Sequence, residues 1–275
     1  YGDHRDLHSF PTRRSSDLLV STVREMCTAL RRAAYSTILR ESLDCSTAIF
    51  DGEGQLIGQA DHVPSHQGSL SLAARQVARQ FDLEPGDVVI MNHPYQGGTH
   101  HPDIMLFKPV FVKNKLLAIT GALGHQIDVG GRSPGSVSTD ARDVFEEGIM
   151  IPPMKLYRRG KIVPEILEMV GANIRVPSKT LGDIRAEVAA VTVGERRYVE
   201  LAEKYGIKAT IVFNNENKGV AEGNNQGIEL ALKEGCEHVL LANNDIEFDN
   251  PHLISSLRSQ ITERKLAAIT PNRLH

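Results

Sequence analysis

The chain has 275 residues, of which 41% are hydrophobic and 24% are charged, and its formal net charge at pH 7 is -3, with a sequence pI near 6.4. These values are typical of a globular protein with one large domain or two small ones. They exclude a strongly basic surface of the kind that attracts nucleic acid or anionic lipid, so we expect no nucleic-acid partner and no membrane partner.

The three cysteines Cys27, Cys45 and Cys236 are an odd number and lack CxxC spacing. The composition therefore predicts neither a disulfide framework nor a structural zinc site, and it favours a reducing, cytoplasmic location. No apolar run approaches the roughly 18 to 20 residues that span a bilayer. The N-terminus also lacks the apolar centre of a secretory signal, so we expect a soluble chain that is not exported.

Residues 1–18 show neither a helical nor a strand apolar period, and they mix His, Arg, Asp and Ser with one Pro. We expect this segment to be a disordered tail without a folded element. When it is read back into codons, it resembles a translated short-read sequencing adapter. The alternative is a flexible natural tail of similar composition. On the adapter interpretation the tail is artefactual and is left out of functional reasoning.

Regular patterns begin at Leu19. Apolar residues recur at three- and four-residue steps over 19–38, which predicts an amphipathic helix of about five turns. Residues 46–59 predict a hairpin with its turn at 51–54. A second helix is expected over 70–81, and the apolar run 88–91 predicts a strand that leads into a glycine-rich loop. Another strand is expected over 116–122.

Three chemically notable side chains follow these two predicted strands: His100 and Asp103 in the glycine-rich loop, and His125 just after the second strand. If the strands are neighbours, their ends present all three side chains to a common point. Two imidazoles and one carboxylate suit a divalent metal and leave coordination positions open for a substrate. The alternative for each histidine is an ordinary surface or packing residue.

Further polar residues surround this candidate site in the sequence. His62 and His66 lie four residues apart around Pro64, which excludes a continuous helix between the two histidines. They either line the same cleft or are ordinary turn residues. Asp128 either orients His125 through a hydrogen bond or is a surface carboxylate. The chain contains no GxxxxGK[ST] motif and so predicts no nucleotide site of that kind.

The sequence pattern changes again near residue 206. Residues 207–213 predict a strand, 224–233 a helix closed by Gly235, and 238–241 a second strand, which together form one βαβ unit. No linker rich in Pro or Ser marks the junction at 206–209. We therefore predict an α+β mixed domain over 19–206, followed by a separate fragment over 209–275.

A series of ordered short motifs runs through the predicted domain, at 32–36, 40–46, 62–69, 85–87, 94–100, 128–131, 145–148 and 182–186. Through these motifs, residues 19 to about 206 resemble the N-terminal part of the hydantoinase B/5-oxoprolinase family, which includes the metal-bearing subunits of N-methylhydantoinase and acetone carboxylase. Two departures from the family pattern are His93, where Asp is usual, and Gln126, where a second His is common.

This resemblance implies that His100, Asp103 and His125 are ligands of manganese, iron or zinc. A bound cation would polarise a substrate carbonyl or stabilise an enolate. The implied activity is ATP-linked hydrolysis of a cyclic amide such as hydantoin or 5-oxoproline, or carboxylation of a related ketone. ATP would be handled by a partner resembling hydantoinase A. The chain would be a truncated form of such a subunit, inactive alone.

Residues 209–275 resemble the interior of a family 2 glycosyltransferase, an α/β domain of the GT-A type. The resemblance is carried by 217–227 and by Asn243-Asn244-Asp245. In such enzymes the last Asp helps hold the metal on the sugar-nucleotide diphosphate, which gives Asp245 that role here. The remaining parts of that domain are missing, so we expect no glycosyl transfer. The alternatives are a plain βαβ unit, or a chimeric chain without a function of its own.

Overall fold

The computed structural model describes residues 11–60, 63–205 and 219–233, together with the single residues 235, 239, 257 and 259. The chain divides into two units. One comprises Tyr1–Ser15 and Lys208–His275, and the other comprises Ser16–Ile207. All strands of the described residues lie in the second unit, which also contains the candidate site.

A seven-stranded sheet forms the centre of the Ser16–Ile207 unit, with strand order β2-β1-β5-β4-β3-β6-β7. Every pair of neighbouring strands is antiparallel. The strands are β1 (Cys45–Asp51), β2 (Leu56–Gln59), β3 (Val88–Met91), β4 (Asp103–Val112), β5 (Lys115–His125), β6 (Met154–Arg158) and β7 (Lys161–Ile162).

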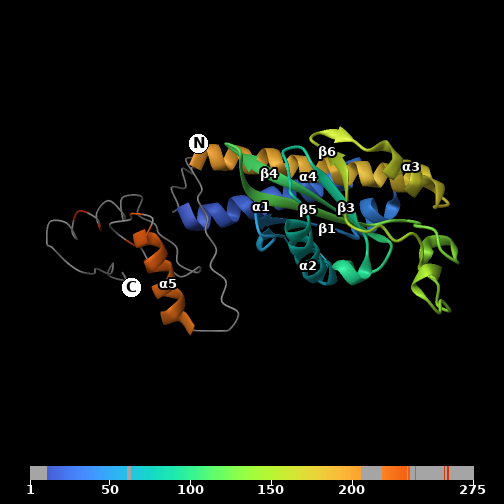
Figure 1. The fold of residues 1–275 in the computed structure, drawn as a ribbon, viewed down its shortest axis with the longest axis horizontal. Helices are drawn as coiled ribbons and strands as arrows, with labels where there is room; N and C mark the ends of the chain where they lie inside the picture. The colour runs from blue at the N-terminus through green and yellow to red at the C-terminus, as the bar shows by residue number, and fades with distance from the viewer. Residues whose placement is uncertain are drawn as a thin grey trace, which may run out of the picture. The chain divides into compact units, whose positions relative to one another are not determined.

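Helices cover both faces of this sheet. Helix α1 (Pro11–Ala33) and the long helix α4 (Pro177–Tyr205) lie side by side on one face, and α2 (Pro64–Gln80) lies on the other (Figure 1). Helix α3 (Pro164–Ala172) contacts α4. Short helical turns occur at Ile38–Ser42 (a π-helix), Pro94–Gln96, Pro134–Ser136 and Val144–Glu147.

Side-chain alternation along the strands explains the layered core. Successive strand residues point to opposite faces, so a sheet that is covered on both sides is apolar at every position. The central strand β3 illustrates this, because all four of its residues are buried. Ile90 and Leu106 pack with α1 and α4, whereas their neighbours Val89 and Phe107 pack with α2.

Several predicted elements are confirmed. The helix expected from residue 19 is α1, and its apolar stripe is buried at Leu19, Val23, Met26 and Leu30. The hairpin is β1 with β2, and the strand at 88–91 is β3. The second helix was predicted over 70–81, but α2 begins at Pro64. Proline is tolerated in the first turn of a helix, because the backbone N–H groups there form no hydrogen bond within the helix.

The start of α1 corrects one prediction. Helix α1 begins at Pro11, although no folded element was expected before Leu19. A proline at the first helical position is compatible with this start, since its fixed φ suits a helix. The expected disorder is therefore wrong for residues 11–18. Residues 1–10 lie outside those that the structure describes.

Strand β4 was not predicted. It begins at Asp103, within the segment taken as a loop, and it separates β3 from β5. The two strands expected to be neighbours are therefore not adjacent. Asp103 and His125 instead lie on β4 and β5, which pair directly with each other, and His100 lies in the loop just before β4.

The C-terminal part is described mainly through α5 (Gly219–Lys233), which includes the helix predicted over 224–233. Gly235 has a φ of 83°, and its N–H donates to the Leu232 carbonyl, as expected for a glycine after a helix. The predicted strand over 207–213, Asp245 and all of the predicted strand over 238–241 except residue 239 lie outside the described residues. Within the part of the chain that the structure describes, no helix is long and apolar enough to cross a membrane.

Candidate metal centre

Antiparallel pairing brings the predicted ligands together. Asp103 opens β4, His125 closes β5, and these two residues are direct partners in the ladder. His125 Nδ1 lies 3.1 Å from Asp103 Oδ1. His100, in the preceding loop, places its Nε2 3.1 Å from both Asp103 Oδ1 and His125 Nδ1. The three residues form a group whose ligand atoms all lie within 4.8 Å of one another.

These separations fit a single small cation. Donor atoms about 2.1 Å from one ion lie roughly 3.0 Å apart at octahedral angles and roughly 3.4 Å apart at tetrahedral angles. The observed spacing of 3.1 Å falls between these values. Two imidazoles with one carboxylate suit manganese, iron or zinc. Asp103 is almost fully buried, whereas the His100 side chain is 45% exposed, so the group opens to solvent on the His100 side.

The loop before Asp103 is held by one buried amide. The Nδ2 atom of Asn92 donates to the carbonyls of His101 and Ile149, and its Oδ1 accepts from the Ile151 N–H. Gly97 has a φ of 103°, and a Cβ there would lie 2.6 Å from the Ala73 nitrogen. Glycine is therefore required at this turn, because a side chain would be both strained and blocked.

Two further residues complete the cluster. Sequence reasoning did not single out Asp44, whereas it offered His66 either as a residue of this cleft or as an ordinary turn residue, and the first alternative matches its position. Asp44 precedes β1, and its carboxylate oxygens lie 3.5 Å from His66 Nε2 and 3.7 Å from His125 Nδ1. His66 lies in the first turn of α2, with its Nε2 3.6 Å from Asp103 Oδ2. Its Nδ1 is hydrogen bonded to the Ser46 hydroxyl at 3.0 Å.

Hydrogen bonding determines the charge of Asp103. Burial opposes ionisation, yet hydrogen bonds from His100, His125 and Thr99 hold the pKa of this carboxyl well below its usual range. The hydrogen bond to Asp103 also raises the pKa of His100. Burial lowers the pKa of His66, although Asp103 and Asp44 act in the opposite direction. The cluster therefore combines an anionic carboxylate with imidazoles of unequal basicity.

A second polar group lies behind the same strand ends, on the face covered by α4. Gln126 donates through Nε2 to Glu187 Oε1 at 2.7 Å and to the Gly124 carbonyl. A Cβ on Gly124 would lie 2.9 Å from Glu187 Oε1, so glycine makes room for this contact. Complete burial and the nearby Asp183 raise the pKa of Glu187 well above its ordinary value.

Asp128 has a structural role. Its carboxylate accepts from the N–H groups of Gly130, Gly135 and Arg175 and from the Arg175 guanidinium. Among the residues described, it makes no hydrogen bond to His125, and it is buried, so it neither orients this imidazole nor is a surface carboxylate. It instead fixes the loop that follows β5. His62, the other predicted cleft residue, lies outside the described residues.

Sequence comparison gives one family and several relatives. The sequence model of the family described as Hydantoinase B/oxoprolinase matches residues 15–221. The beta subunit of caprolactamase from Pseudomonas jessenii is 32% identical over 219 residues, which cover 79% of this chain and 38% of that protein. The B subunit of a putative D-/L-hydantoinase from Pseudomonas sp. (strain NS671) is 33% identical over 205 residues, 72% of this chain and 35% of that protein.

The 5-oxoprolinase of Saccharomyces cerevisiae is 36% identical over 227 residues, which cover 78% of this chain and 17% of the enzyme. The chain therefore spans about a third of the two bacterial proteins and about a sixth of the yeast protein. The crystal structure of ATP-dependent caprolactamase from Pseudomonas jessenii superimposes with a TM-score of 0.67 at 34% identity, covering 71% of this chain and 34% of that one. Acetone carboxylase shares the fold, with a TM-score of 0.67 at 20% identity over 71% of this chain and 26% of that one.

Proposed function

Because the chain belongs to the hydantoinase B/oxoprolinase family, we propose that it is part of the metal-binding subunit of an ATP-linked enzyme that hydrolyses cyclic amides. Hydantoins, 5-oxoproline and related lactams are the proposed substrate class. The observation that carries the proposal is the convergence of His100, Asp103 and His125, with ligand atoms within 4.8 Å. Carboxylation of a small ketone is the alternative within the same fold.

The residues of the cluster have separable roles in this proposal. His100, Asp103 and His125 would hold manganese, zinc or iron, and Asp44 lies where it can add a fourth donor. A divalent ion held there would supply Lewis acidity toward the carbonyl oxygen of the ring amide. His66 positions Asp103 and Asp44, because its Nε2 faces both carboxylates while Ser46 fixes its other nitrogen. The exposed side of His100 leaves an open path by which substrate can reach the metal.

ATP chemistry is assigned to a partner. We propose an ATP-binding subunit resembling hydantoinase A, in a cytoplasmic complex, because this chain contains no GxxxxGK[ST] motif and the caprolactamase and hydantoinase relatives are named as subunits. The chain spans about a third of those relatives, and we propose that substrate turnover requires the ATP-binding partner.

Metal content after dialysis tests the ligand assignment. Wild-type protein should retain about one manganese or zinc ion per chain. Asp103→Ala should retain less than about a tenth of that, because it removes the anionic donor. His93→Ala is the matched control, since His93 lies in the same loop but outside the cluster. Equal metal content in all three proteins, with folding verified by circular dichroism, would refute the assignment.

A separate proposal concerns the two ends of the chain. We propose that residues 209–275 derive from a family 2 glycosyltransferase, with Asp245 as a former metal ligand, and that residues 1–18 are a translated adapter, which makes the chain chimeric. The glycine-rich stretch 217–227 and the Asn-Asn-Asp motif support the first part, whereas the match to the hydantoinase B/oxoprolinase model, which covers 15–221, argues against placing the two junctions as early as 209 and as late as 18. Long-read sequencing of the locus provides the test. An unbroken gene across residues 18/19 and 206/209 would contradict the chimera.

A further inference from the structure

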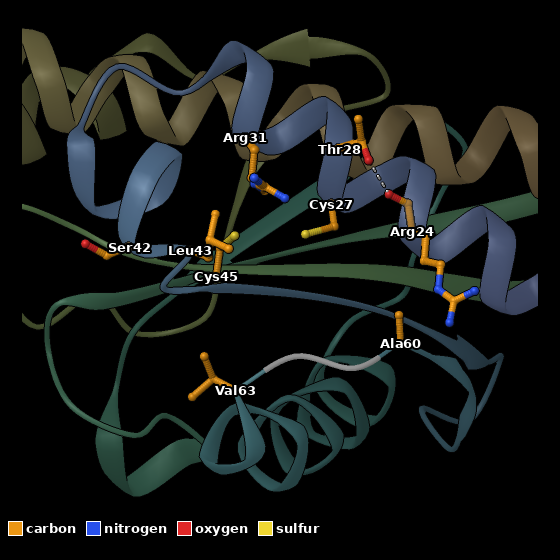
Figure 2. Close-up of a pocket in the computed structure, with 9 residues that line it drawn as sticks. All are labelled: Arg24, Cys27, Thr28, Arg31, Ser42, Leu43, Cys45, Ala60 and Val63. Carbon is orange, nitrogen blue, oxygen red and sulfur yellow. Dashed lines mark hydrogen bonds between the residues drawn. The ribbon is translucent and has the colours of Figure 1, made fainter.

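A cavity of about 690 Å³ lies between α1 and the start of β1 (Figure 2). Two thiols from different elements line it, Cys27 from the middle of α1 and Cys45 from the first position of β1. Arg24 and Arg31 line it as well, on the exposed surface of α1. The two thiols belong to the core on the sheet face that α1 and α4 cover, whereas the proposed metal ligands lie on the α2 face. The cavity also reaches Val63, the residue directly before α2.

The two thiols touch each other and differ in exposure. Cys45 is buried, Cys27 is only partly buried, and neither forms a disulfide in this structure. The Cys45 thiol is hydrogen bonded to the Cys27 thiol, and this bond together with burial raises the pKa of Cys45. Figure 2 shows both side chains extending into the same space. Cys27 is therefore the thiol that a small oxidant in the cavity reaches first.

We propose that Cys27 and Cys45 form an oxidation-sensitive pair that closes to an intramolecular disulfide when a hydroperoxide enters this cavity. The Cys27 sulfur attacks the peroxide, forming a sulfenic acid and releasing water as the O–O bond breaks. The Cys45 sulfur then attacks the Cys27 sulfur, the S–O bond breaks, and the hydroxyl leaves as a second water with the Cys45 proton. Two thiols and one hydrogen peroxide thus give one disulfide and two waters.

The position of Cys45 gives this link a structural consequence. Strand residues alternate between faces, so Asp44 and Ser46, the neighbours of Cys45, point to the opposite side. There Asp44 lies beside His66 and His125, and Ser46 is hydrogen bonded to His66. A disulfide between Cys27 and Cys45 would tie α1 to the start of β1, between Asp44 and Ser46, and would restrict the movement of these two residues.

Peptide mapping tests the pair in the full chain. A Cys236→Ser background removes the third cysteine, which lies outside the described residues. Native protein is treated with hydrogen peroxide, alkylated and digested with trypsin. Cleavage after arginine places Cys27 in peptide 25–31 and Cys45 in peptide 41–75. The expected product is these two peptides joined within a monomer, with the link removed by dithiothreitol.

Single variants make the assignment specific. In Cys45→Ser, Cys27 should accumulate as a sulfenic acid that dimedone traps. In Cys27→Ser, Cys45 should oxidise at least about tenfold more slowly than it does in the pair, because Cys45 is buried and burial disfavours its thiolate and its contact with the oxidant. The Cys27→Ser comparison still decides the matter if Cys45→Ser does not fold. The proposal fails if the native pair stays reduced, links only between chains, or if Cys45 oxidises equally fast without Cys27.

Discussion

Asp103 and Glu187 are two buried carboxyl groups that lie behind the same strand ends, on opposite faces of the sheet. Asp103 is 2% exposed and Glu187 is 0% exposed. Their pKa values nevertheless shift in opposite directions, downward for Asp103 and upward for Glu187. Burial alone therefore does not determine whether a carboxyl group at this point of the fold carries a charge.

The neighbours of each group account for the difference. Two imidazoles and the Thr99 hydroxyl surround Asp103, and all three can donate to its oxygens. Glu187 receives one amide donor from Gln126 and lies near a second carboxyl, Asp183. Donors favour the ionised form, whereas desolvation and a like charge favour the protonated form. One face can therefore hold a cation, whereas the other favours the protonated form of Glu187.

The same isosteric change at the two positions should have unequal effects on metal binding. Asp103→Asn removes the anionic donor and should weaken binding of manganese or zinc by more than about 100-fold, since even the loss of a partner outside the ligand set costs about 10- to 100-fold. Glu187→Gln should change it by less than about threefold. Titration calorimetry measures both. A similar loss in the two variants would mean that the comparison between the faces is wrong.

The pH dependence of metal affinity should belong to the Asp103 face alone. The raised pKa of His100 means that protons compete with the metal from above the ordinary value of 6.5. Affinity should therefore be highest at alkaline pH and fall by up to about tenfold per pH unit for each proton displaced as the pH decreases through this range. Glu187→Gln should show the same profile as wild type. A flatter pH profile of metal affinity in Glu187→Gln would mean that Glu187 influences the metal site through the sheet.

The contribution of Glu187 to protein stability should depend on pH in the opposite direction to metal affinity, decreasing as the pH rises. Glu187 holds its proton in the folded state above its ordinary pKa of 4.5. Above pH 4.5, Glu187 binds fewer protons in the unfolded chain than in the folded protein. Its contribution to folding stability is therefore fully present below pH 4.5 and is lost as the pH rises toward its folded-state pKa. The slope is at most about 1.4 kcal/mol per pH unit. Urea unfolding of Glu187→Gln at several pH values should lack this slope. A parallel decline in both proteins would argue against a buried neutral Glu187.

The convergence of His100, Asp103 and His125 could be predicted from the sequence, but the strands that bring them together could not. β4 contains Pro109 and Lys108, which are unusual in a central strand. Pro109 is tolerated beside an irregularity at Val110/Phe111. Lys108 is paired with Glu195 of α4 at 3.3 Å. Both accommodations depend on tertiary contacts that local periodicity does not reveal.

For a similar reason, Asp44 could not be placed from the sequence, and His66 could be placed in the cleft only as one of two alternatives. Asp44 joins the cluster because β1 pairs with β5, where the partner of Cys45 is Gly124, 79 residues along the chain, and no local pattern specifies that pairing. His66 joins it because α2 begins at Pro64 rather than near residue 70. The apolar stripe of α1, by contrast, repeats within a single element and was predictable.

The smallest expected effect is that of Gly68→Ala, which should change the stability of the protein without changing its metal affinity. Gly68 lies inside α2, two residues after His66, and a Cβ there would meet no atom within 4 Å. Gly68→Ala should therefore stabilise the protein by roughly 0.5 to 1 kcal/mol, because alanine loses less backbone freedom on forming a helix. The change adds no charge and alters no donor around Asp103 or Glu187, so metal affinity and both pH profiles should stay as in wild type. Calorimetry with urea unfolding gives both readouts. A gain in stability that also changed metal affinity would mean that the effect of Asp103→Asn includes the packing of α2 as well as the lost carboxylate.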